Sequence, residues 1–394
     1  MKREDIIRYA YERVPFYSQL RNKARGDGYP VIDKHMILND TNRLFSPEYF
    51  SELFADKLER VFTSGSTGDC LEILWRKDQN IRSLLPLWNM RKKYYGILPN
   101  HRRCHFFITK IKDGQEIQIE ESKYALGFCK TDLSEEKVLS IYKKMELFAP
   151  EWMIIQPSML AILMKVIKKF NCSPLSELRY IEITGECMPE DGKREAASFF
   201  GCQIASQYGC YEVNSIAYEC PCGNMHVMKE NVFVEIVNGD EICVTSLHNR
   251  VMPFIRYKVG DRGRIDWNVN CACGNRAPVL YLNKARDNDY IIYKDGTIFH
   301  SDILYGIVER INLLMERPIL QYQIVQEDYE YFLIYIVLDD EEDAQSVEEM
   351  FKRLAKDYHI KGKLDFFFVD YLFPSEKTGK LAWFCSKMKG DGRL

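Results

Sequence analysis

The hydrophobic pattern changes along this chain, and that change constrains the fold more than any other feature. Tyr180–Thr184 has the composition of a buried strand, and Gly185 ends it. Glu190–Phe200 then has the spacing of an amphipathic helix, which Gly201 closes. A strand, a glycine turn and a helix, followed by a further strand, predict an α/β architecture for this part of the chain.

A β-rich portion follows from residue 232. Val232–Val237 and Glu241–Leu247 flank Asn238-Gly239, which is the strongest short hairpin signal. The last part of the chain has a third pattern, in which helix, strand, strand, helix and strand occupy Ser301–Met315, Leu320–Val325, Tyr331–Val337, Ser346–Tyr358 and Leu364–Val369. We expect that part to form a small α+β domain with a three-stranded sheet.

The length also requires more than one core, since 394 residues exceed the roughly 100–200 residues of an ordinary domain. A charged, strand-poor stretch, Ala285–Asp289, separates the two halves of the pattern. We therefore predict an α/β multidomain chain, with a large domain over residues 1–285 and a small one over residues 286–394. Further helices are expected over Glu4–Arg13, over Ser83–Tyr95 with an interruption at Pro86, over Glu135–Phe148, and from Pro157.

The composition excludes several classes of partner. Lysine and arginine number 54 against 57 aspartates and glutamates, a net charge of −3, which offers no general field for nucleic acid or an anionic membrane. No apolar run approaches the roughly 20 residues of a membrane-spanning helix, and the first five residues lack the apolar core of a secretory signal. The 13 scattered cysteines do not resemble a secreted disulfide scaffold, so we expect a cytoplasmic protein.

The most specific local motif is a run of six small residues, Thr63-Ser64-Gly65-Ser66-Thr67-Gly68, which follows the strand-like Val61-Phe62. The backbone amides and hydroxyls of such a loop can surround phosphate oxygens. It is not a P-loop, because Asp69-Cys70 stand where that motif has its lysine. A simple surface turn is the alternative interpretation of the same residues.

This run resembles the phosphate loop of the adenylate-forming superfamily, whose members activate a carboxylate with ATP as an acyl-adenylate. Three more motifs of that superfamily follow in order, namely Gln207-Tyr208-Gly209-Cys210-Tyr211-Glu212, Arg256-Tyr257-Lys258-Val259-Gly260-Asp261 and Pro374-Ser375-Glu376-Lys377-Thr378-Gly379-Lys380. The chain resembles the phenylacetate–CoA ligase-like branch in its start at Tyr9–Tyr17, in Ile183-Thr184-Gly185-Glu186 and in its paired cysteines.

The resemblance implies a role for each motif. The loop residues, which are Thr63, Ser64, Gly65, Ser66, Thr67 and Gly68, would bind the β- and γ-phosphates. Glu212 would hold Mg²⁺, and Asp261 would accept hydrogen bonds from both ribose hydroxyls. Tyr208 would stack on adenine, in a pocket edged by Gly185, Glu186, Gln207 and Gly209. Outside this context, each of these residues would be an ordinary surface acid or core tyrosine.

Three basic residues complete the implied machinery. Lys380 would neutralise charge at the α-phosphate, and Arg256 would support the phosphates. Arg286 would begin a hinge, about which the small domain rotates between adenylation and thioester formation. The chain departs from the usual motifs at three positions, because Tyr211 and Val259 replace threonines and Ala285 replaces a glycine. These departures bear on rate and on the geometry at the α-phosphate rather than on the fold.

Two cysteine pairs predict a structural zinc site. Cys220 and Cys222 form one Cys-x-Cys-Gly turn, and Cys271 and Cys273 form another. Four thiolates on two such turns can bind zinc tetrahedrally, with His226 as a spare ligand should one cysteine face away. Four unligated buried cysteines are the alternative. A catalytic thiol at Cys210 has no paired base in the sequence.

The leading functional prediction is an ATP-dependent, AMP-forming ligase for a carboxylic acid, aromatic by the branch resemblance, with coenzyme A as the acceptor. A carrier-protein phosphopantetheine is the close alternative. Phe106, Phe107 and Tyr124 fall where they could line an acyl pocket or simply belong to an aromatic core. Two other hypotheses are a degenerate nucleotide-binding regulatory homologue and a zinc-ribbon nucleic-acid binder, and the net charge disfavours the second.

Overall fold

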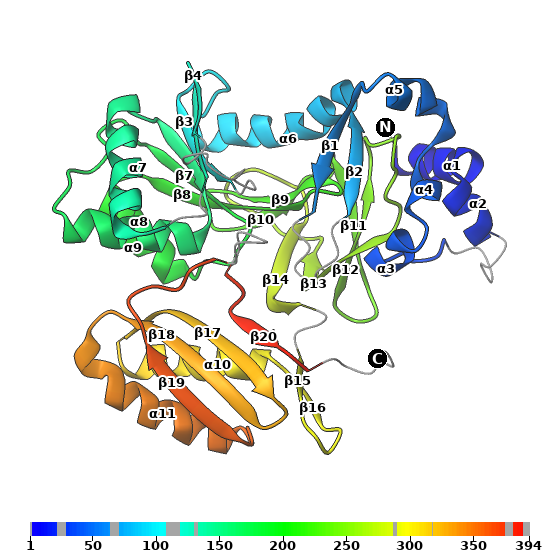
Figure 1. The fold of residues 1–394 in the computed structure, drawn as a ribbon. Coiled ribbons are helices and arrows are strands. Elements are labelled where there is room, and N and C mark those ends of the chain that lie inside the picture. The colour runs from blue at the N-terminus through cyan, green and yellow to red at the C-terminus, as the bar shows by residue number, and fades with distance from the viewer. Residues whose placement is uncertain are drawn as a thin grey trace.

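The protein is described by a computed structural model that covers residues 2–21, 29–63, 71–107, 119–129, 133–286, 290–316, 318–374 and 381–388. A large body carries a smaller C-terminal unit, which lies below it in Figure 1. The body ends with β14 (Val279–Arg286), and the small unit begins with β15 (Tyr290–Ile292). The predicted boundary between residues 285 and 286 therefore falls at the end of β14.

The centre of the body is a twelve-stranded mixed sheet with the order β11-β12-β13-β14-β10-β9-β8-β7-β6-β3-β5-β4. Strands β5, β3, β6, β7 and β8 pair in parallel, and the remaining pairs are antiparallel. The strand bounds are β3 (Arg103–Phe107), β4 (Ile119–Ser122), β5 (Ala125–Cys129), β6 (Trp152–Ile155), β7 (Tyr180–Thr184), β8 (Gln203–Cys210), β9 (Asn214–Glu219), β10 (Met225–Val227), β11 (Val232–Val237), β12 (Glu241–Ser246) and β13 (Tyr257–Asp266). This architecture confirms the predicted α/β class.

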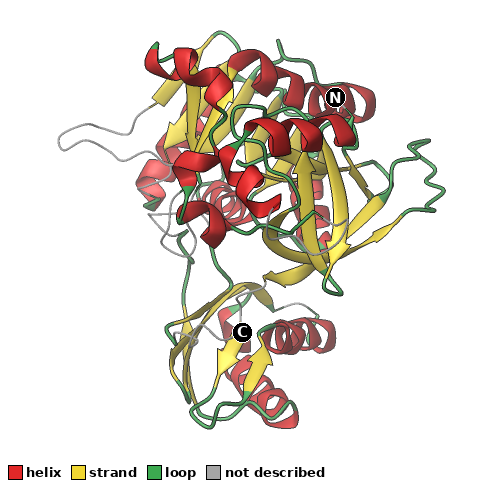
Figure 2. Ribbon diagram, turned by 90° about the vertical axis from the view of Figure 1, so that its right-hand side faces the viewer, coloured by secondary structure: helices red, strands yellow, loops and turns green. Residues whose placement is uncertain are grey.

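Helices cover both faces of the parallel part of the sheet (Figures 1 and 2). One face packs on α7 (Glu135–Phe148), α8 (Pro157–Lys169) and α9 (Glu190–Phe200), and Ile181 and Ile183 of β7 point into that layer. The other face packs on α6, and Tyr180 of the same strand points there. The side chains of successive residues of β7 thus pack into opposite helical layers, as the period of two in a strand requires.

Helix α6 (Lys77–Tyr95) corrects one sequence prediction, because it continues through Pro86 without a break. An interior proline removes one backbone hydrogen bond and costs about 3 kcal/mol in a helix. Leu87 and Tyr95 of this helix are buried against the sheet in a cluster with Trp152 and Tyr218. Tertiary packing therefore holds the helix together across the residue that locally opposes it.

The β-rich half of the body is closed by the N-terminal helices. These are α1 (Arg3–Arg13), α2 (Pro15–Arg21), α3 (Lys34–Leu38), α4 (Thr41–Leu44) and α5 (Phe50–Phe54). Ile6 and Ala10 of α1 are fully buried in one cluster with Val244 and Phe254. A separate two-stranded sheet, β1 (Leu58–Phe62) with β2 (Glu72–Arg76), carries the segment predicted to bind phosphate.

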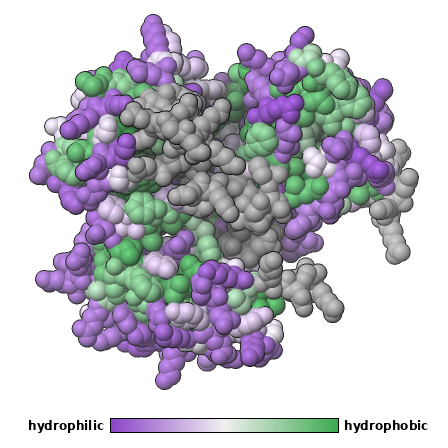
Figure 3. Space-filling model, in the orientation of Figure 1, coloured by the Kyte–Doolittle hydropathy of each residue, from purple (hydrophilic) through white to green (hydrophobic). Residues whose placement is uncertain are grey.

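The C-terminal unit is a four-stranded sheet with the order β19-β18-β17-β20, backed by α10 (Asp302–Leu314) and α11 (Ala344–Asp357). Its strands are β17 (Ile319–Asp328), β18 (Tyr331–Leu338), β19 (Lys363–Phe368) and β20 (Phe384–Ser386), and a hairpin of β15 with β16 (Ile298–His300) precedes them. The prediction of three strands was wrong, because Phe384–Ser386 adds a parallel edge to β17. Hydrophilic colour gathers along the lower edge of this unit in Figure 3, where α11 lies.

Among the described residues, no helix is both long enough and apolar enough to cross a membrane.

Candidate active site

A cavity of about 3740 Å³ opens at the carboxyl ends of β7 and β8, between the body and the C-terminal unit. Strand ends from the body and β20 from the small unit border it (Figure 1). In open α/β sheets, ligands bind at this edge of the strands. Eight of the predicted binding or catalytic residues line the cavity, namely Thr63, Gly185, Glu186, Gln207, Tyr208, Gly209, Glu212 and Asp261.

The first residue of the predicted phosphate loop, Thr63, lies at this cavity. Thr63 is buried, and its backbone N–H donates to the carbonyl of Leu71 over 3.0 Å, while its hydroxyl accepts from the N–H of Leu71 over 2.9 Å. These two bonds close the base of the β1–β2 connection. Ser64, Gly65, Ser66, Thr67 and Gly68 fall outside the described residues.

Two motifs that are far apart in the sequence meet at Tyr208 and Asp261. The Tyr208 hydroxyl donates to Asp261 Oδ2 over 2.8 Å. Gly209 follows Tyr208 at a point where β8 and β9 approach closely, since an added Cβ would lie 2.3 Å from the carbonyl oxygen of Asn214. Only glycine fits that position beside the tyrosine.

Glu212 is the buried acid of the cavity, with 7% of its surface exposed. The Tyr257 hydroxyl donates to Glu212 Oε1 over 2.8 Å. Burial and the negative charge of Glu212 raise the pKa of Tyr257 far above its ordinary value, so this hydroxyl stays protonated and remains a donor. The bond holds one carboxylate oxygen of Glu212 in place at the cavity.

Glu186 connects the body to the C-terminal segment. It accepts from the N–H and the hydroxyl of Ser158 over 3.0 and 2.9 Å, and from the N–H of Leu381 over 2.9 Å. The residue after Lys380 therefore lies against the Gly185-Glu186 turn. Lys380 itself falls outside the described residues, as does the side chain of Arg286.

Arg256 lies apart from the cavity. Its guanidinium pairs with Glu235 at 2.6 Å and also donates to the carbonyl of Tyr29, toward the N-terminal helices. The backbone at Arg256 has a positive φ of 49°. Instead, Lys258 and Arg262 of the same segment line the cavity. Neither residue was predicted from the sequence, where alternation along the strand was the one signal that could have indicated them.

The two residues that replace motif threonines lie at the cavity, whereas the aromatic residues predicted for the acyl pocket lie elsewhere. Tyr211 and Val259 line the cavity, and Tyr211 is 51% exposed. Phe106 is buried in the core on the α7–α9 side of the sheet, Phe107 packs on His105, and Tyr124 lies in the β4–β5 turn. None of these three aromatic residues lines the cavity.

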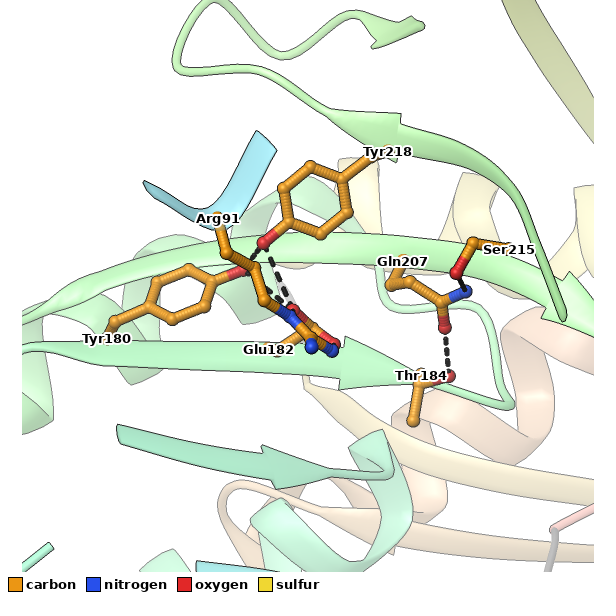
Figure 4. A network of polar contacts seen from close by, with 7 residues as sticks. All are labelled: Arg91, Tyr180, Glu182, Thr184, Gln207, Ser215 and Tyr218. Atoms are coloured by element: carbon orange, nitrogen blue, oxygen red, sulfur yellow. Dashed lines mark hydrogen bonds and ion pairs between the residues drawn. The ribbon is translucent and has the colours of Figure 1, made fainter. Parts of the chain in front are cut away.

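A chain of polar side chains on the α6 side of the sheet was not predicted from the sequence. Thr184 donates to Gln207 Oε1 over 2.8 Å, and Gln207 Nε2 donates to Ser215 Oγ over 3.0 Å, as Figure 4 shows. Behind this chain, Arg91 and Glu182 form a buried ion pair. Alternate residues of a strand share one face, so the spacing of Tyr180, Glu182 and Thr184 is the only sequence signal that places them together.

A second cluster lies where β10 and β14 meet the cysteine turns. The ligand atoms of Cys220, His226, Cys271 and Cys273 all lie within 4.8 Å of one another. Cys222 is exposed and is not among them, so the structure replaces the fourth predicted cysteine with the spare histidine. Cys220 Sγ and Cys271 Sγ are 3.7 Å apart, close to the ~3.8 Å that separates two thiolates about 2.3 Å from one tetrahedral zinc.

The surroundings of this cluster suit a metal. His226 Nδ1 lies 3.0 Å from the carbonyl oxygen of Ala277, which directs Nε2 toward Cys273 Sγ at 3.3 Å. Burial opposes ionisation of Cys271, but hydrogen bonds from the Cys273 N–H, Asn224 and His226 lower the pKa of its thiol to about 5. In contrast, burial raises the pKa of Cys210 well above its ordinary value, which does not suit a nucleophile.

Comparisons with known proteins bear on the fold of the chain. No family model matches the chain. Protein CapK of Staphylococcus aureus is 21% identical over 98% of this chain and 88% of its own length. The phenylacetate-coenzyme A ligase of Thermus thermophilus is 22% identical over 81% of this chain and 75% of its own length.

Among solved structures, 2-hydroxyisobutyryl-CoA ligase with a bound acyl-AMP has a TM-score of 0.71 at 13% identity, over 98% of this chain and 88% of that one. The anthranilate CoA ligase AuaEII reaches 0.55 over 82% and 65%. They confirm the resemblance to the adenylate-forming superfamily and its phenylacetate–CoA ligase-like branch.

Proposed function

We propose that this chain, which has the adenylate-forming fold and resembles the phenylacetate–CoA ligase-like branch, is an ATP-dependent, AMP-forming acid–thiol ligase. It would join a carboxylic acid to ATP as an acyl-adenylate and then transfer the acyl group to a thiol. The supporting observation is the convergence of Tyr208, Asp261, Glu212 and Glu186 on one cavity, since these residues come from three motifs that are separate in the sequence.

The chemistry explains why such a site needs fixed polar groups rather than a protein nucleophile. A carboxylate must attack the α-phosphate of ATP, so two anions have to be brought together and their charge offset. Glu212 and Asp261 fit as ligands of Mg²⁺ and of the ribose hydroxyls, because Tyr257 and Tyr208 hold one oxygen of each carboxylate. When bound, Mg²⁺ would offset the phosphate charge.

The structure places the basic residues of the motifs differently with respect to the cavity. Lys380 remains our candidate for the α-phosphate, since Leu381 beside it contacts Glu186. Arg256 pairs with Glu235, so we assign phosphate support to Lys258 and Arg262, whose side chains line the cavity. Both also contact acids, with Lys258 bonding Glu241 and Arg262 bonding Asp240, so each would have to exchange a partner on binding.

Coenzyme A is our proposed acceptor, because the compared phenylacetate, anthranilate and 2-hydroxyisobutyryl enzymes are CoA ligases by name. A carrier-protein phosphopantetheine presents the same thiol and is the alternative. The branch resemblance points to an aromatic acid, but the three aromatic residues expected near the acyl group lie elsewhere.

We propose a zinc ion for the cluster of Cys220, His226, Cys271 and Cys273. Four protein ligands would close its coordination, so the ion would tie β10 to the turn before β14 and take no part in the reaction.

ATP–pyrophosphate exchange across a panel of carboxylic acids tests the proposed function. Exchange that requires both an acid and Mg²⁺ is the expected result, followed by thioester formation when coenzyme A is added. Nucleotide binding without exchange for any acid would contradict the proposal and favour the degenerate regulatory homologue instead.

A further inference from the structure

The α6 side of the cavity has a polar wall, and only Gln207 of this wall was assigned a role by the motifs, at the edge of the adenine pocket. Thr184 at the end of β7, Gln207 on β8 and Ser215 on β9 form it, and their side chains are joined by two hydrogen bonds of 2.8 and 3.0 Å (Figure 4). All three residues line the cavity together with Leu84 and Leu87 of α6.

This wall faces away from the nucleotide side of the same strand. Ala205 of β8 is buried with Leu87 and Tyr218 in the α6 layer, whereas Ile204 packs against the α7–α9 layer. Alternation along the strand places Gln207 with Ala205 and Tyr208 on the opposite side. A ligand that reaches both sides of β8 would therefore put its adenosine near Tyr208 and its acyl part near Gln207.

The space behind the wall is filled. Glu182, two residues before Thr184 on the same strand face, is 1% exposed, and Arg91 and Tyr218 are 6% and 1% exposed. Arg91 Nε donates to Glu182 Oε2 over 2.7 Å, and the Tyr218 hydroxyl donates to the same oxygen over 3.0 Å. The side chains of this network bond to one another, as Figure 4 shows.

The wall has hydrogen-bonding capacity beyond its two internal bonds. The Gln207 amide nitrogen carries a second hydrogen, the Ser215 hydroxyl accepts from Gln207 and keeps its own hydrogen to donate, and the Thr184 oxygen keeps lone pairs. A ring or alkyl group pressed against these atoms would remove them from water without replacing their bonds. Sites of this kind can reject an analogue that lacks the matching polar group by up to about 10⁴-fold.

We propose that the acyl subsite takes a short carboxylic acid bearing a hydroxyl or amide group near its carboxyl carbon, and that Gln207 is the main specificity-determining residue. The methyl groups of Leu84 and Leu87 would contact the remaining carbon atoms of that acid. This inference rests on the proposed function for the position of the carboxylate, but its direct test does not require turnover.

The test uses stable acyl-adenylate mimics, 5′-O-(N-acylsulfamoyl)adenosines, in isothermal titration of the full chain. Two pairs differ only by hydroxyl against methyl, namely 2-hydroxypropanoyl against 2-methylpropanoyl and 3-hydroxybutanoyl against 3-methylbutanoyl, and a benzoyl mimic represents aromatic acids. At least one hydroxylated mimic should bind ten-fold or more tightly than its methyl partner and than the benzoyl mimic. The Gln207→Leu variant should abolish that preference.

Gln203→Leu is the matched control, because Gln203 is an exposed residue of the same strand and does not line the cavity. It should keep the preference, and Ser215→Ala should weaken it if Gln207→Leu does not fold. Tighter binding of the benzoyl or methyl mimics to the unaltered chain, a preference that survives Gln207→Leu, or no binding of any mimic would each overturn the inference. A clear hydroxyl preference without exchange for any acid would leave the subsite standing and defeat the proposed function alone.

Discussion

Tyr208 and Asp261 are 53 positions apart in the sequence, and the hydroxyl of the tyrosine donates to Oδ2 of the aspartate over 2.8 Å. The bond joins the end of β8 to β13, which are not neighbours in the sheet. It occupies one carboxylate oxygen of Asp261, and both residues line the cavity. The aromatic ring and the carboxylate are thus fixed relative to each other before any nucleotide binds.

Asp261→Asn should weaken ATP use much more than Tyr208→Phe. A hydrogen bond to a charged group contributes about 1.5–3 kcal/mol, so loss of the ribose contacts predicts a fall in kcat/KM for ATP of roughly 10- to 100-fold. Tyr208→Phe keeps the ring and should cost about ten-fold or less. Steady-state kinetics with varied ATP measures both. Asp266→Asn, in the last residue of the same strand, is the control and should behave as the unaltered chain.

The buried Arg91–Glu182 pair should make a large contribution to stability when one partner is removed. Glu182→Gln leaves a buried guanidinium without its counter-charge, which typically costs about 3–5 kcal/mol. The free energy of unfolding from urea titration measures this loss. Glu195→Gln breaks an exposed pair with Lys168 and should cost under about 1 kcal/mol. Equal losses in the two variants would show that the buried network is not structurally important.

Measurement of bound metal distinguishes the ligand set with His226 from the predicted set of four cysteines. Elemental analysis of protein purified without chelators should find about one zinc per chain. Cys222→Ser should keep that content, because this cysteine is exposed and lies outside the cluster. His226→Ala should lower it to well below one. The opposite pattern, with metal lost from Cys222→Ser and kept in His226→Ala, would restore the four-cysteine set.

Local sequence signals predicted the elements whose ends are defined by neighbouring residues. Helix α9 ends at Phe200 as predicted, because Gly201 adopts the left-handed conformation with φ of 64°. The three residues of β20 carried no local signal, since their pairing with β17 joins segments about 60 positions apart. Long-range contacts of this kind decide an element that is too short to show a period.

The same distinction applies to the candidate site. The sequence motifs predicted Tyr208, Asp261 and Glu212 through resemblance, and all three lie at the cavity. Arg256 was predicted with them, but its side chain pairs with Glu235 instead, a long-range contact that no motif spacing reveals. His226 approaches Cys273 because β10 pairs with β14, with His226 opposite Val279. A register between distant strands decides that contact.

The hinge hypothesis predicts an unequal effect on the two half-reactions. Asp287→Pro restricts the backbone between β14 and β15, which would hinder rotation of the C-terminal unit. ATP–pyrophosphate exchange should fall by less than about three-fold, while transfer of the acyl group to coenzyme A falls at least ten-fold. Single-turnover measurements separate the two steps. Equal losses in both would remove the hinge assignment.

The central claim is that a carboxylate oxygen attacks the α-phosphate of ATP in this cavity. Oxygen-18 labelling tests it most directly, using whichever acid supports exchange, with both carboxylate oxygens labelled and coenzyme A as the acceptor. Mass spectrometry should find one labelled oxygen in the AMP and one in the thioester. AMP without the label, or label released in ADP or inorganic phosphate, would contradict the proposed mechanism.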